Sequence, residues 1–270
     1  MDGAERAATL GEVAGWHPGR MTRHADPRPD ARPDSAPRWT PGRRPSLVLL
    51  DLDGTLTDSA PGITSSMAAA FAELGLPVPD AAGLRSMVGP PLAQGIQERG
   101  VPADRVDDVV AVYRRLFRAG GMLGGNSVFP GMESALTRLQ DAGVRMAVAT
   151  SKPQVLAREI ASHFGLDRFM EGGTEGVFGA DTDGGPRSSK AAVIAHALGS
   201  LDEVPPAEQV VMVGDREHDV HGAASHGLAA VAVAWGYAEP GEVEAAGALA
   251  VVRSPEELGT LLLGTSRPVG

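Results

Sequence analysis

LVLLDLDGTLTDS, residues Leu47–Ser59, is the stretch of this sequence that decides the fold. Leu47–Leu50 form an unbroken apolar run, which is typical of a strand covered on both faces of a parallel sheet. Asp51 and Asp53 follow at once, and Gly54 permits a tight turn after them. Because open α/β sheets bind ligands at the carboxyl ends of their strands, two carboxylates there indicate a shared cation. A capped Asp-Gly turn explains the bare motif equally well, so this stretch alone leaves both interpretations open.

Other apolar runs along the chain predict the rest of the sheet. Four further strands are expected, at 145–149, 210–213, 229–233 and 249–252. Segments with the periodicity of amphipathic helices separate them, and this alternation is typical of a parallel sheet flanked by helices. The sequence therefore predicts an α/β fold with a Rossmann-like parallel sheet. No strand is expected in the glycine-rich segment 172–186.

A helical insertion is expected between the first and second strands. The segments 67–76 and 102–121 have helical periodicity, and a shorter helix is expected after 89–91. An insertion of this length is too long for a simple crossover connection. The sequence therefore predicts an all-helical cap domain at 59–127. The core domain around it would comprise 46–58 and 128–264.

Composition limits what else the chain contains and binds. Residues 1–45 are rich in proline and arginine and poor in aliphatic side chains, which predicts a disordered tail. The net charge of −10 argues against a nucleic-acid partner, and the chain has no cysteine for thiol catalysis. It has neither a run of roughly 18 apolar residues nor a secretory signal pattern, so we expect no membrane association and a cytoplasmic location. No feature of the sequence indicates an oligomeric state.

Lysine usage singles out two positions. Of the 24 basic residues, Lys152 and Lys190 alone are lysine, and arginine occupies the other places. A position that keeps lysine against this bias is a candidate for a role that needs a compact ammonium rather than a planar guanidinium. Lys190 also stands at the start of a predicted helix, where a cation opposes the helix dipole. Lys152 is compatible with a functional role or with a solvated surface position.

The second predicted strand ends in two hydroxyl side chains. Thr150 and Ser151 directly follow the strand at 145–149. By itself, a strand followed by Thr-Ser is more often the start of a capped helix than a phosphate site. Taken alone, these two residues therefore do not indicate a phosphate site.

Another pair of acids follows the strand at 210–213. Asp215 and Asp219 are four residues apart, and such residues share one face once a helix has begun. His218 and His221 lie beside them and would suit zinc, but the oxygen-rich set favours Mg²⁺. We therefore expect a magnesium site rather than a zinc site.

These motifs, in this order, resemble those of the haloacid dehalogenase superfamily of phosphohydrolases. The resemblance rests on DLDGTLTDS, on TSKP at 150–153, on Lys190 in RSSKAAVIAHALG and on GDREHD at 214–219. The inserted helices are similar to the helical C1 cap of one branch of the superfamily, and the overall pattern is nearest to its phosphoglycolate phosphatase-like members. The resemblance implies a core with a parallel sheet and a separate helical cap.

The resemblance also implies a role for each site residue. Asp51 would be the nucleophile that attacks phosphorus, Asp53 the general acid and base, and Lys190 the cation that neutralises the phosphoryl group. The phosphate would be bound by Thr150, Ser151 and Lys190. The metal Mg²⁺ would be held by Asp51, by Asp53 through its backbone carbonyl, by Asp215 and by Asp219.

The expected function is therefore a magnesium-dependent phosphatase that acts through an aspartyl-phosphate intermediate. Its substrate would be a small phosphorylated metabolite, a phosphate monoester such as a phosphoglycolate-like compound, a nucleotide or a sugar phosphate. Asp53 argues against a dehalogenase, because expulsion of a halide needs no acid. A phosphomutase of the same fold and a non-catalytic binding protein remain as alternatives. Candidates for substrate selection on the cap are Met87–Pro91, Tyr113, Arg114 and Arg115. An arginine there could bind a substrate carboxylate or a second phosphate, but a solvated helix face is the more frequent explanation.

Overall fold

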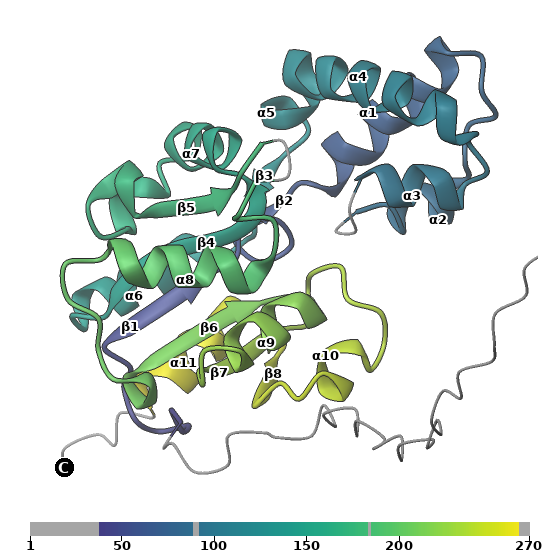
Figure 1. The fold of residues 1–270 in the computed structure, drawn as a ribbon. Helices are drawn as coiled ribbons and strands as arrows, with labels where there is room; N and C mark the ends of the chain where they lie inside the picture. Colours follow the sequence, from purple (N-terminus) through teal and green to yellow (C-terminus); the bar gives the residue numbers. More distant parts are fainter. Residues whose placement is uncertain (1–37, 89–91, 183–184, 265–270) are drawn as a thin grey trace, which may run out of the picture. The chain divides into compact units, whose positions relative to one another are not determined.

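The core of the protein is a parallel sheet with helices on both faces. The computed structural model describes residues 38–88, 92–182 and 185–264. Within these ranges the sheet has six strands in the order β5-β4-β1-β6-β7-β8, and every neighbouring pair is parallel (Figure 1). The strands are β1 (Leu47–Leu50), β4 (Arg145–Pro153), β5 (Val177–Ala180), β6 (Val210–Gly214), β7 (Ala229–Val233) and β8 (Ala250–Val252).

The central strand β1 divides the apolar core into two layers. Val48 and Leu50 belong to one cluster of buried side chains, and Leu47 and Leu49 belong to the other. This alternation follows from the two-residue period of a strand, so a run that is apolar throughout covers both faces. The first layer is completed by α6 (Met132–Asp141), α7 (Gln154–His163) and α11 (Pro255–Leu263), and the second by α8 (Lys190–Ser200) and α9 (Glu217–Ala224) (Figure 1).

The predicted α/β fold class is confirmed, with one strand missed. All five expected strands are present. The missed strand is β5, which lies inside 172–186, where no strand was expected. It follows Gly176 and contains Gly179, so it lacks the unbroken apolar run that marks β1, and it pairs with β4 alone.

Helices fill the chain between two short strands, β2 (Thr57–Asp58) and β3 (Ser127–Val128). These strands pair antiparallel, so the chain leaves and re-enters the core side by side. The helix expected at 67–76 is present but begins earlier, and the helix expected at 102–121 is split into several helical segments. The short helix expected after 89–91 is also present, although 89–91 themselves lie outside the described residues. The helix α2 was not expected. In order the helical segments are α1 (Ala60–Glu73), α2 (Ala81–Arg85), α3 (Leu92–Glu98), a 3-10 turn η1 (Ala103–Arg105), α4 (Val106–Leu116), a π-helical turn η2 (Phe117–Gly121) and α5 (Met122–Gly124). Across the described ranges, no helix has the length and apolar character needed to cross a membrane.

The predicted disordered tail, residues 1–45, includes residues that are folded in the structure. Trp39 is only 1% exposed and belongs to the same core cluster as Val48 and Leu50. Its indole Nε1 donates a hydrogen bond to the backbone oxygen of Arg43 at 2.5 Å. Residues 38–45 therefore belong to the folded core, because one large apolar side chain holds a segment that is otherwise polar and proline-rich. Residues 1–37 lie outside the described residues.

Replacing Trp39 with alanine is expected to lower the free energy of unfolding by about 3–5 kcal/mol, because a fully buried indole would leave a cavity. Urea denaturation followed by circular dichroism measures this change. The control is Val78→Ala, at a valine that is 48% exposed, for which the stability should change by no more than about 0.5 kcal/mol. Equal midpoints for Trp39→Ala and Val78→Ala would show that Trp39 does not support the core.

Candidate active site

Three carboxylates converge at the carboxyl ends of β1 and β6. Asp51 follows β1 and Asp215 follows β6, and the two strands are neighbours in parallel register, with Leu50 opposite Val213. Asp219 lies in the first turn of α9 and returns to the same place. Oxygen atoms of the three side chains lie within 4.8 Å of one another, and all three residues are buried. The structure therefore brings together the acids that two distant motifs supply.

Glycines allow these carboxylates to approach so closely. Gly54 has φ of +82°, and a Cβ there would lie 2.2 Å from Oδ2 of Asp215. A Cβ on Gly214 would lie 2.2 Å from the carboxyl carbon of Asp219. Any other residue at these two positions would displace an acid of the cluster, so both glycines are required by close packing.

Lys190 meets the carboxylate cluster from the start of α8. Its Nζ lies 2.8 Å from Oδ1 of Asp51 and 2.7 Å from Oδ1 of Asp219. It also donates a hydrogen bond to the backbone oxygen of Ala149 at 3.0 Å. Burial by itself would lower the pKa of this ammonium, but the Asp219 and Asp51 carboxylates raise it above its ordinary value. Lys190 is therefore a charged group, and the long glycine-rich segment before it does not displace it from the site.

The cluster carries more negative charge than Lys190 can neutralise. Burial raises the pKa of Asp51 to about 6 against the opposing charge of Lys190. Burial, followed by the charges of Asp51 and Asp219, raises the pKa of Asp215 well above its ordinary value. Among the described residues, Oδ1 of Asp215 has no hydrogen-bond partner, whereas Oδ2 accepts from the backbone N–H of Tyr237 at 2.7 Å. A hard divalent cation fits this set, since it would supply the missing charge and partner.

Thr150 and Ser151 lie beside this cluster at the end of β4. Thr150 is buried, its side chain opposes the rise in the pKa of Asp51, and its Oγ1 accepts from the backbone N–H of Lys152 at 3.3 Å. Ser151 is exposed at the wall of the same cavity. Both candidates for phosphate binding thus line the cavity that contains Asp51.

The Asp53 carboxylate lies outside the three-acid cluster. Its Oδ2 is 2.6 Å from Nζ of Lys152, and the side chain of this lysine is only 7% exposed. Asp53 nevertheless lines the same cavity as Asp51 and Lys190, which has a volume of about 180 Å³. The sequence left two interpretations of Lys152 open, a functional role and a solvated surface position. The second is wrong, because the side chain is buried.

Tyr237 is a site residue that sequence reasoning did not identify. Besides its backbone bond to Asp215, its hydroxyl accepts from the backbone N–H groups of Ser59 and Ala60 at 2.8 and 3.0 Å. The same hydroxyl donates to Oδ1 of Asp58 at 3.0 Å. Tyr237 therefore joins the acid cluster to the start of α1. The only available signal was its position, in the loop after the strand beside β6.

Arg216 was also given no role from the sequence. Its Nε donates to Oε1 of Glu242 at 2.7 Å, and its Nη1 donates to the backbone oxygen of Val88 at 3.2 Å. Val88 directly precedes 89–91, the part of the candidate substrate-selecting turn that lies outside the described residues. The backbone N–H of Arg216 donates to Oδ2 of Asp219 at 3.1 Å, so Arg216 connects the acid cluster to Val88.

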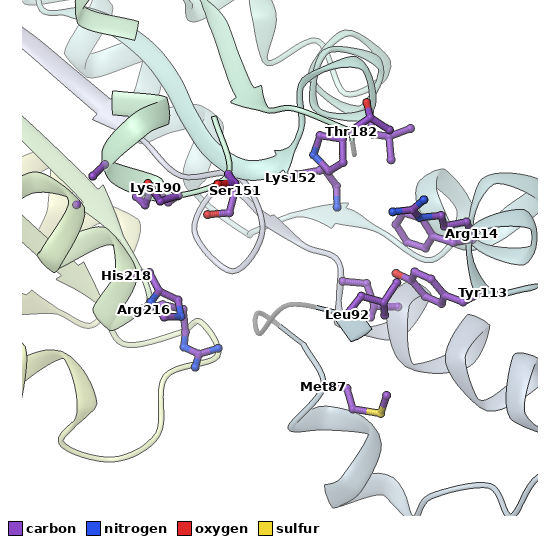
Figure 2. Close-up of a pocket in the computed structure, with 18 of the residues that line it drawn as sticks. Met87, Leu92, Tyr113, Arg114, Ser151, Lys152, Thr182, Lys190, Arg216 and His218 are labelled. Atoms are coloured by element: carbon purple, nitrogen blue, oxygen red, sulfur yellow. The ribbon is translucent and has the colours of Figure 1, made fainter. Parts of the chain in front are cut away.

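A larger cavity of about 1100 Å³ opens from this site toward the helices of the insertion (Figure 2). Met87, Tyr113 and Arg114, which were candidates for substrate selection, line it from α2–α4 and their connections. Arg115 also lines it, but its guanidinium is 2.6 Å from the Glu73 carboxylate. Among the described lining residues, Glu217 is the single acid against several cations, so the cavity favours an anionic ligand.

Comparison with known proteins identifies the family. The model of the haloacid dehalogenase-like hydrolases matches residues 48–233. The chain belongs to this family. The matched residues include Asp51, Asp215 and Asp219, and so the whole carboxylate cluster.

Several members of the family are similar to this chain over most of its length. The tyrosine-protein kinase PtkA of Mycobacterium tuberculosis is 46% identical over 198 residues, 73% of this chain and 65% of that protein. The 5'-nucleotidase of Pseudomonas aeruginosa is 42% identical over 73% of this chain and 86% of its own length. A plasmid-encoded phosphoglycolate phosphatase of Cupriavidus necator is 38% identical over 80% and 93%. The chain thus spans less than two thirds of the mycobacterial relative's length.

The crystal structure of a predicted phosphatase from Clostridium acetobutylicum has the same fold. It matches with a TM-score of 0.73 at 36% identity, and the match covers 82% of this chain and 99% of that one. The resemblance to the superfamily and the α/β fold class are thereby both confirmed.

Proposed function

We propose that the protein is a magnesium-dependent phosphatase that hydrolyses a small phosphate monoester through an aspartyl phosphate on Asp51. The observation that carries this proposal is the pairing of a buried Asp51 with Lys190 at 2.8 Å, beside two further acids. A cation at the nucleophile lowers the repulsion between an anionic carboxylate and an anionic phosphate. The family and the names of its phosphatase members support the same reaction.

Mg²⁺ would be held by Asp51 and Asp215, with the backbone carbonyl of Asp53. When bound, it would supply positive charge that neutralises the phosphoryl oxygens. Asp219 belongs to the same cluster, but Lys190 lies at one of its oxygens and the backbone N–H of Arg216 donates to the other at 3.1 Å. We therefore assign Asp219 two contributions, negative charge at the metal site and orientation of Lys190.

The residues of the chain would carry the two chemical steps. The Asp51 carboxylate forms a bond to phosphorus while the ester P–O bond breaks, and Asp53 gives its proton to the leaving oxygen. Asp53 then takes a proton from the water that attacks phosphorus, which releases inorganic phosphate and restores Asp51. Thr150, Ser151 and Lys190 hold the phosphate oxygens during both steps.

Phosphate release from a panel of monoesters tests this function. The panel contains p-nitrophenyl phosphate, phosphoglycolate, nucleoside monophosphates and sugar phosphates, each with Mg²⁺ or with EDTA. We expect release from at least one ester with Mg²⁺, and a loss of at least about 100-fold in EDTA, because the cluster would lose its cation. Equal rates with and without the metal would contradict the magnesium site. Silence of the folded protein across the panel would favour the mutase or the non-catalytic alternative.

A second candidate function is phosphoryl transfer from a nucleoside triphosphate to a protein tyrosine. The 46% identity to the mycobacterial proteins named tyrosine kinases favours it. Incubation with γ-labelled ATP and a tyrosine-containing peptide separates the two functions. Label on the peptide that survives hydroxylamine is phosphotyrosine and supports the kinase, whereas an unlabelled peptide, with the same preparation hydrolysing a monoester, supports the phosphatase.

A further inference from the structure

Lys152 lies between the active site and the helical insertion. Its Nζ is 2.6 Å from Oδ2 of Asp53 and 5.2 Å from the centre of the Phe117 ring. The register between β4 and β5 shifts between Thr150 and Pro153, so this part of β4 leaves the regular ladder. In Figure 2, Lys152 extends from the core into the space that Tyr113 borders from α4. The ammonium is therefore in contact with a catalytic candidate on one side and an aromatic ring of the insertion on the other.

The two oxygens of Asp53 have different surroundings. Oδ2 is held by Lys152, whereas Oδ1 is buried and has no hydrogen-bond partner among the described residues. Asp53 lines the small cavity that also contains Asp51 and Lys190, where the phosphoryl group would bind. Holding one oxygen in place leaves the other available for the proton that a leaving group or a water exchanges.

We propose that Lys152, supported by Phe117, is a positioning residue that orients the Asp53 carboxylate for proton transfer to the leaving group. This inference rests on the proposed phosphatase function. It makes the helical insertion part of the catalytic apparatus through Phe117, in addition to any contact with substrate.

Physical chemistry supports a shared role for the ion pair and the ring. A lysine that is 93% buried needs compensation, and within the described residues Asp53 is its one ion-pair partner. The face of an aromatic ring attracts a cation, and this attraction grows when water is excluded. Phe117 is itself buried and begins η2, and π-helical turns frequently occur at functional sites. Both contacts hold Nζ in one place, and through it Oδ2 of Asp53.

The leaving group distinguishes this role from mere support of the fold. A p-nitrophenolate leaves readily without a proton, whereas an alkoxide needs one as the P–O bond breaks. The constant kcat/KM reports the steps up to formation of the aspartyl phosphate, in which Asp53 acts as the acid. A variant that misplaces Asp53 will therefore lose more kcat/KM with an alkyl phosphate than with p-nitrophenyl phosphate. A variant that merely loosens the structure will lose kcat/KM by the same factor with both esters.

The experiment measures kcat/KM for both esters in full-length protein with Mg²⁺. For Lys152→Met we expect a fall of about 30-fold or more with the alkyl ester and of about 3-fold with p-nitrophenyl phosphate, within the range of general acid catalysis. Lys152→Arg should lose less kcat/KM with the alkyl ester than Lys152→Met does, because it keeps the cation. Phe117→Leu should change the ratio of the two constants in the same direction, by a smaller factor.

Phe169→Leu is the matched control. Phe169 is as buried as Phe117 and also contacts a cation, with the Arg168 guanidinium 4.4 Å from its ring, but it does not line either cavity. We expect the ratio of its kcat/KM values for the two esters to equal that of the wild type. An active wild type with an unchanged ratio in Lys152→Met, Lys152→Arg and Phe117→Leu would overturn the inference alone. A wild type without magnesium-dependent release would overturn the proposed function, and the inference with it.

Discussion

Asp51→Asn is expected to abolish phosphate release, with a loss of about 10⁴-fold or more, because an amide cannot form the acyl phosphate on which both steps depend. Asparagine keeps the volume of the side chain and removes one of three crowded negative charges. The folded state should therefore persist, and a thermal unfolding curve verifies this. Phosphate release with Mg²⁺ at saturating substrate measures the effect.

The control for this substitution is Asp108→Asn. Asp108 is an exposed acid of α4 whose carboxylate lies 3.1 Å from the Arg105 guanidinium, and it lines neither cavity. We expect normal activity for this variant. Near-normal turnover in Asp51→Asn would rule out the nucleophile assignment and, with it, the aspartyl-phosphate pathway.

Lys190→Met is expected to reduce both activity and stability. The substitution leaves the Asp51 and Asp219 carboxylates without the ammonium that lies 2.8 and 2.7 Å from them. Removing one partner from a buried ion pair costs about 3–5 kcal/mol, since the other charge remains unpaired. The phosphoryl group also loses a cation that would act on its developing charge, for which we expect a fall of about 10³-fold in kcat.

Urea denaturation in EDTA measures the stability effect without interference from a bound metal. The control is Arg145→Met, which removes the cation of a half-exposed pair, 2.7 Å from the Glu171 carboxylate, and should cost no more than about 1 kcal/mol. Equal losses of stability for the two variants would show that Lys190 does not compensate the buried acids. An unchanged kcat in Lys190→Met would show that Lys190 does not stabilise the charge that develops on the phosphoryl group.

Much of the fold and of the candidate site could be predicted from the sequence. The apolar run of β1 and the two acids after it have a local signal, because the period and polarity of neighbouring residues report burial and strand ends directly. The order of the motifs then predicted that Asp51, Thr150, Lys190 and Asp215 would meet. Asp51, Thr150 and Asp215 do meet, because the carboxyl ends of neighbouring parallel strands lie at one edge of the sheet. Lys190 joins them from the start of α8.

Elements that lack a local signal could not be predicted. The strand β5 follows Gly176 and contains Gly179, and its pairing with β4 stabilises it. Trp39 lies in a segment whose composition indicates disorder, yet a single buried indole holds part of it against the core. In each case a distant partner supplies the stabilisation that the segment's own residues lack.

The two lysines show the same division most clearly. Their rarity marked Lys152 and Lys190 as candidates from the sequence alone, since a compositional bias is visible without any structure. Which acid each one contacts was decided by the tertiary structure, which places Lys190 against Asp51 and Lys152 against Asp53. The paired residues are about 100 or more positions apart, so their contact depends on strand order and on the bend at the end of β4, neither of which local periodicity reports.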